Sequence, residues 1–178
     1  MIYPWLAGIF EDLTDRQRRD RLPHALLFAG QQGLGKLDLA LALVKQLLCV
    51  EGSSCGVCKT CHLLGAGSHP DFKLIQPEED SRQIKIEQVR QLTDWVNQTA
   101  QMGGLKIAVL SPAHAMNRNS ANALLKAMEE PPQNTHLILV SDDPAQLLAT
   151  IRSRSQIVQI PVPPRTVAIE WLMQQDNK

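Results

Sequence analysis

A glycine-rich segment near the start of the chain has the residue types and the spacing to hold a phosphate group. The segment runs from Gly30 to Leu37 (GQQGLGKL) and matches G-x-x-x-x-G-K-[ST] at every fixed position except the last. It follows a short apolar run and opens a helical pattern, so backbone N–H groups and the helix dipole would favour an anion there. We therefore predict a phosphate-binding loop that consists of Gly30, Gly33, Gly35 and Lys36.

The same segment lacks residues that metal-assisted hydrolysis requires. Leu37 stands where a hydroxyl normally ligates Mg²⁺, and leucine has no oxygen to offer. The apolar run 106–110 ends in Ser111-Pro112, at the point where P-loop ATPases carry acidic residues for metal and water. We therefore expect no ATP hydrolysis by this chain. The residues alone leave two readings of the loop open, a nucleotide site and a glycine turn without a ligand.

All four cysteines lie close together in the sequence, with the pattern C-x5-C-x2-C-x2-C. A closed set of four thiolates is the usual ligand set of a structural zinc ion. Iron–sulfur segments of similar spacing continue to a cysteine followed by proline, which is absent here. Free or redox-active thiols are the other alternative. We predict structural Zn²⁺ bound by Cys49, Cys55, Cys58 and Cys61.

The order of apolar and amphipathic segments predicts an α/β fold. Short apolar runs typical of strands occupy 24–29, 72–75, 106–110, 136–140 and 156–160. Helical spacing occupies 37–48, 86–100 and 119–130, and Gly103-Gly104 and Pro131-Pro132 follow the last two. Strands that alternate with helices indicate right-handed crossovers and a parallel sheet flanked by helices. A further helix is expected from about Thr166.

Composition limits the classes of function. The 178 residues are 44% apolar, enough for one domain with a sizeable core, and Lys plus Arg (18) equals Asp plus Glu (18). A free-standing DNA-binding protein usually has a basic excess, because it neutralises phosphates. No apolar run approaches the roughly 20 residues that cross a bilayer, and the N-terminus does not read as a signal peptide. We expect a cytoplasmic protein without a membrane contact.

Two further motifs carry a family resemblance. The segment 120–132 (SANALLKAMEEPP) resembles the S-x-N-A-L-L-K-x-x-E-E-P-P helix of clamp-loader subunits, and Ser153-Arg154-Ser155 is similar to their Ser-Arg-Cys element. With the glycine loop, the four cysteines and His69-Pro70-Asp71, the order resembles AAA+ clamp-loader subunits of bacterial DNA polymerase III over almost the whole chain. Glu129 and Glu130 at a helix end oppose the helix dipole, so we expect a local partner or an interface for them.

The resemblance implies a fold, a function and partners. It implies an AAA+ domain over 1–163 with a zinc module at 49–61, and the start of a helical lid domain at 164–178. It further implies a subunit that does not act as ATPase or polymerase by itself, and that helps to load a sliding clamp onto primed DNA together with the gamma/tau and delta subunits. Arg154 matches the arginine that reaches the ATP of a neighbouring subunit, and Ser141 matches a phosphate-sensing position.

Two other functions are compatible with the residues. One is an ATPase of the gamma/tau type that holds Mg²⁺ with other ligands. The other is a zinc-knuckle module that binds nucleic acid, although the neutral charge and the few aromatic residues (one Tyr, three Phe, three Trp) argue against it.

Overall fold

The computed structural model describes residues 2–102 and 104–176, and within them a five-stranded sheet is the central layer. Its order is β2-β3-β4-β1-β5, and each neighbouring pair is parallel. The predicted parallel sheet is therefore confirmed. The strands are β1 (Ala25–Ala29), β2 (Phe72–Ile75), β3 (Lys106–Leu110), β4 (Thr135–Ser141) and β5 (Gln156–Gln159).

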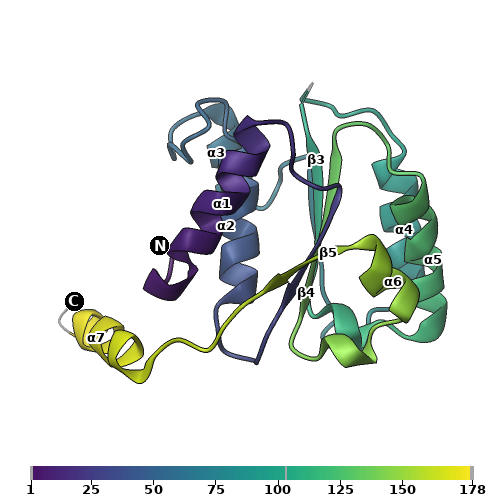
Figure 1. Cartoon of the computed structure of the whole chain (residues 1–178). Coiled ribbons are helices and arrows are strands. Elements are labelled where there is room, and N and C mark those ends of the chain that lie inside the picture. The colour runs from purple at the N-terminus through teal and green to yellow at the C-terminus, as the bar shows by residue number, and fades with distance from the viewer. Residues whose placement is uncertain (1, 103, 177–178) are drawn as a thin grey trace.

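Helices cover both faces of this sheet, as Figure 1 shows. Helices α1, α2 and α3 lie on one face and α4, α5 and α6 on the other, whereas α7 lies apart from the sheet, near the N-terminus. Their bounds are α1 (Ala7–Arg18), α2 (Lys36–Leu48), α3 (Lys59–Gly65), α4 (Ile86–Val96), α5 (Arg118–Glu129), α6 (Ala149–Arg154) and α7 (Arg165–Asp176). Three single 3₁₀ turns are η1 (Pro4–Leu6), η2 (Ala113–Ala115) and η3 (Pro144–Gln146).

The central strand β1 shows why its sequence is apolar throughout. Successive side chains of a strand point to opposite faces of the sheet. Leu27 belongs to the apolar cluster with α4 and α5, whereas Leu26 and Phe28 belong to the cluster with α1 and α2. All five residues of β1 are buried. A strand that is covered on both faces leaves no position for an exposed polar side chain.

Helix α4 ends four residues before the predicted end at residue 100, at Val96. The carboxylate of Asp71 accepts hydrogen bonds from the backbone N–H groups of Gln101 and Met102, each at 2.8 Å. The ammonium group of Lys106 donates to the carbonyl oxygen of Gln98. These contacts hold the segment after α4 in an irregular course instead of a further helical turn. Gly103, to which part of the predicted stop was assigned, lies outside the described residues.

Three observed helices were not predicted, α1, α3 and α6, and of these α3 and α6 have only seven and six residues. Helices of this length complete at most two turns, so an apolar stripe has too few positions to be recognised. In the part of the chain that the structure describes, no helix is long and apolar enough to cross a membrane.

Candidate functional site

The glycine loop connects the end of β1 to the start of α2, at the edge of the sheet where the parallel strands end. Gly33 and Gly35 have φ angles of +84° and +81°, in the left-handed region that favours glycine. At Gly30 a Cβ atom would lie 2.6 Å from the carbonyl oxygen of Ile160. The loop backbone thus favours glycine at these three positions.

Lys36, the lysine of the loop, is already paired within the chain. Its Nζ lies 2.7 Å from Oδ1 of Asp142, the residue that follows β4, and it also donates to the carbonyl oxygen of Gln31. The Lys36 side chain is only 3% exposed, and that of Asp142 is 31% exposed. A phosphate at this loop would have to compete with a carboxylate for the charge of the lysine.

The positions that would hold Mg²⁺ and water have other roles in this chain. Leu37 packs against the apolar cluster that includes α1 and α2. Ser111 and Ser141 are buried at the ends of β3 and β4. Nδ1 of His114 lies 3.2 Å from Oγ of Ser141 and 3.3 Å from the N–H group of Asp142. The histidine therefore links these strand ends as a structural residue.

Three aromatic side chains pack together beside the loop, and we call Tyr3, Trp5 and Trp171 the aromatic cluster. Their ring centroids lie 4.9 to 5.6 Å apart. The indole N–H of Trp5 donates to the carbonyl of Leu34, and a Cβ atom on Gly35 would lie 2.4 Å from the ring of Tyr3. Residues from both ends of the described chain therefore cover the turn that leads into α2.

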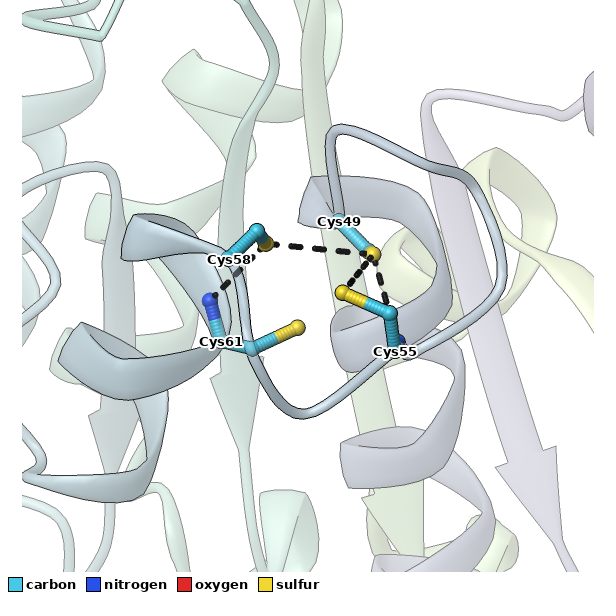
Figure 2. A group of neighbouring side chains, drawn as sticks. All are labelled: Cys49, Cys55, Cys58 and Cys61. Atoms are coloured by element: carbon cyan, nitrogen blue, oxygen red, sulfur yellow. Dashed lines mark hydrogen bonds between the residues drawn. The ribbon is translucent and has the colours of Figure 1, made fainter.

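The four cysteines lie in one group, although three elements supply them (Figure 2). Cys49 follows α2, Cys55 lies in the loop after it, Cys58 precedes α3 and Cys61 lies within α3. The four Sγ atoms lie within 4.8 Å of one another, with 3.6 Å between Cys49 and Cys55 and 4.0 Å between Cys49 and Cys58. These thiols are free, and the group can hold a metal ion.

Backbone N–H groups stabilise the charged form of two of these sulfurs. Sγ of Cys49 accepts from the N–H of Cys55, and this bond is the main reason that the pKa of Cys49 is lowered to about 6. The N–H of Cys61 donates to Cys58 and lowers the pKa of that thiol. Burial raises the pKa of Cys61 to about 12. Without a cation, the group thus favours fewer than four thiolates.

Arg154 does not lie with the glycine loop of its own chain. It is the last residue of α6, and its Nη2 lies 2.7 Å from Oε1 of Glu129, the last residue of α5. Both helices cover the face of the sheet opposite α2 (Figure 1). The expected local partner of Glu129 is thus present.

Several basic side chains of the N-terminal segment have structural partners. Arg16 pairs with Asp12 and Arg18 pairs with Asp15, as on a solvated helix face. Nε2 of His24 lies 3.2 Å from the carbonyl oxygen of Met128. The basic stretch that also includes Arg19 and Arg21 is therefore interspersed with carboxylates.

Sequence reasoning did not find Asp142 or the aromatic cluster. One signal was available for Asp142, because it follows a predicted strand of a parallel sheet, and the carboxyl ends of parallel strands meet at one edge. The aromatic cluster had no local signal, since Tyr3 and Trp171 are brought together only by tertiary folding.

Together, a parallel sheet and a glycine loop between β1 and α2 define a P-loop fold of the AAA+ class. A gamma subunit-related protein of DNA polymerase III from Thermotoga maritima has a similar structure, with a TM-score of 0.63 and 22% identity over 88% of this chain and 47% of that chain. The Holliday junction branch migration motor RuvB of Thermotoga maritima gives 0.57 at 15% identity, over 96% of this chain and 50% of that one.

A family model described as "DNA polymerase III, delta subunit" matches residues 6–164, so the chain belongs to this family. The delta' subunit of Pseudomonas aeruginosa DNA polymerase III is 45% identical over 96% of this chain and 52% of its own length. The delta' subunit of Escherichia coli K12 is 39% identical over 96% and 52%. The tau/gamma subunit of Haemophilus influenzae is 38% identical over 82% of this chain and 21% of its own length. The chain spans about half the length of the delta' relatives.

Proposed function

We propose that this chain is the non-catalytic AAA+ part of a clamp-loader subunit, and that it supplies Arg154 to the ATP site of a neighbouring subunit. The observation that carries the proposal is the ion pair between Lys36 and Asp142. It neutralises the loop lysine, while Leu37 offers no oxygen for Mg²⁺. The loop is therefore retained as structure, and its own hydrolytic function is lost.

The location of Arg154 supports a role in another subunit's site. An arginine that stabilises charge on a transferring phosphoryl group must reach that group from outside the phosphate loop. Arg154 ends a short helix on the opposite face from α2, and its side chain is 37% exposed. By this proposal, the partners are gamma/tau and delta subunits, with the sliding clamp and primed DNA engaged through the complex.

The four cysteines fit zinc as the structural metal. A tetrahedron with Zn–S bonds of about 2.3 Å places neighbouring sulfurs about 3.8 Å apart. The Sγ atom of Cys49 lies 3.6 Å from that of Cys55 and 4.0 Å from that of Cys58. A bound zinc ion would fix the loop between α2 and α3. The 13-residue α2 separates this group from the glycine loop by about 20 Å, so zinc there would be structural and not catalytic.

Three measurements test the proposal. Isothermal titration with ATP and Mg²⁺ is expected to give no turnover by the purified chain, and rapid turnover would favour an ATPase of the gamma/tau type. In a loader assembled with ATPase subunits, Arg154→Ala is expected to lower clamp-stimulated hydrolysis about tenfold or more. Wild-type rates for this variant would contradict a role in trans, whereas salt-sensitive DNA binding by the isolated chain would favour a nucleic-acid module.

A further inference from the structure

The side chain of Arg154 has contacts on two sides. Nη2 lies 2.7 Å from Oε1 of Glu129, and Nη1 donates to the carbonyl oxygen of Thr150 at 3.3 Å. Thr150 is one turn earlier on α6, and Glu129 comes from α5, which packs against α6. Two helices thus determine the orientation of the guanidinium group.

Glu129 occupies a position that disfavours a carboxylate. It is the last residue of α5, where unpaired carbonyl groups give the helix end a partial negative charge. A glutamate there is unfavourable unless a cation compensates it. Arg154 is that cation. The Glu129 side chain is 50% exposed and the Arg154 side chain is 37% exposed. An ion pair with such exposure contributes little to stability, so stability alone does not explain it.

The neighbouring arginine on α6 shows a different arrangement. Arg152 donates to the carbonyl oxygen of Pro144, so its guanidinium group is held within the chain. A guanidinium group has five N–H donors in a fixed plane. Among the residues that the structure describes, Arg154 uses them for Glu129 and Thr150, so donors remain for an external acceptor.

We propose that Glu129 is a positioning residue, which holds the Arg154 guanidinium so that its remaining N–H donors are directed at the nucleotide of the neighbouring subunit. This inference rests on the proposed function of Arg154. A free arginine must lose rotamer freedom when it engages a phosphate, and a guanidinium that is already fixed loses less. Glu129 lowers this entropic cost without touching the nucleotide.

The test uses the natural full-length subunit, assembled with the ATPase subunits, the clamp and primed DNA. Glu129→Ala is expected to lower kcat for ATP about threefold to tenfold and to change KM less than about twofold, because orientation matters most in the transition state. Glu129→Gln keeps an acceptor oxygen and is expected to recover part of the rate. Glu79→Ala is the control, since Glu79 is also an exposed glutamate and has no ion pair among the described residues.

The double variant Glu129→Ala/Arg154→Ala separates the two proposals. If Glu129 acts through Arg154, the double variant has the rate of Arg154→Ala alone. A further loss in the double variant, or a wild-type kcat for Glu129→Ala beside a strongly impaired Arg154→Ala, overturns the positioning role only. A wild-type rate for Arg154→Ala overturns the proposed function itself. If Glu129→Ala does not fold, Glu129→Gln gives the same comparison with fewer changes in shape.

Discussion

The Nζ atom of Lys36, the lysine of the glycine loop, lies 2.7 Å from Oδ1 of Asp142, the residue that follows β4. The pair is asymmetric, because the lysine side chain is 3% exposed and the aspartate side chain is 31% exposed. Removing the aspartate therefore has a different consequence from removing the lysine. A lysine left alone cannot hydrate, whereas an aspartate left alone can.

We therefore expect Asp142→Ala to lower the free energy of unfolding by about 2–4 kcal/mol, because it leaves a buried ammonium group without its counter-charge. Lys36→Met is expected to cost less than about 1 kcal/mol. The double variant should be more stable than Asp142→Ala alone, since an apolar pair replaces the isolated charge. Urea unfolding of the four proteins measures this cycle. Losses that simply add would show that the two side chains are not coupled.

Gly35 and Gly33 offer a matched comparison in the same loop. Both have a positive φ, but a Cβ atom on Gly33 meets nothing within 4 Å, whereas one on Gly35 meets the ring of Tyr3. Gly33→Ala should cost about 1 kcal/mol from backbone strain alone. Gly35→Ala should cost clearly more, and Tyr3→Ala in the same chain should remove the excess. Thermal unfolding measures the difference, and equal losses at the two glycines would contradict the packing of Tyr3 on the loop.

The sequence predicted the sheet and the main helices because these follow from local patterns. Strand β1 is apolar throughout and β3 is apolar after Lys106, since both faces of these strands are covered, and this is visible in the residues themselves. The pairing of Lys36 with Asp142 depends instead on the direction of two side chains from separate strand ends. The early end of α4 depends on Asp71, which is distant in the sequence from Gln101 and Met102, whose N–H groups donate to its carboxylate. Such contacts are decided by tertiary packing.

The candidate sites also differ in whether the local sequence or the tertiary packing determines them. The cysteine group was predictable because its ligands are close in the sequence, and the structure brings all of them together. The motif that includes Glu129 indicated that this residue needs a partner, but the identity of the partner, Arg154, required the packing of α5 on α6. The role of Arg154 in trans and the domain boundary near residue 163 stay predictions.

Metal removal should have a local effect. We expect about one zinc per purified chain by mass spectrometry, and its loss on Cys55→Ser or on dialysis against a chelator. Most of the buried core lies elsewhere, in two clusters on the two faces of the sheet. Far-ultraviolet circular dichroism should therefore keep its α/β character, while hydrogen exchange increases between Cys49 and Cys61. Complete unfolding on chelation would show that the module supports the whole domain.

Stability should fall as the pH drops below about 6.5, the ordinary pKa of histidine. Burial lowers the pKa of His69 and of His136 in the folded chain. Between the lowered pKa and the ordinary one, the unfolded chain binds more protons than the folded chain, so protonation favours unfolding. The stabilisation is fully present above pH 6.5 and is lost as the pH falls through that range.

Asparagine substitutions test this pH dependence and keep the hydrogen bond that each ring makes through Nδ1. Nδ1 of His69 accepts the N–H of Asp71, and Nδ1 of His136 lies 3.0 Å from the carbonyl oxygen of Pro23. An asparagine oxygen can replace the first atom and an asparagine N–H the second. Urea midpoints measured from pH 7.5 to 5 should decline for the wild type and change much less for His69→Asn/His136→Asn. A parallel decline in both proteins would assign the effect to other groups.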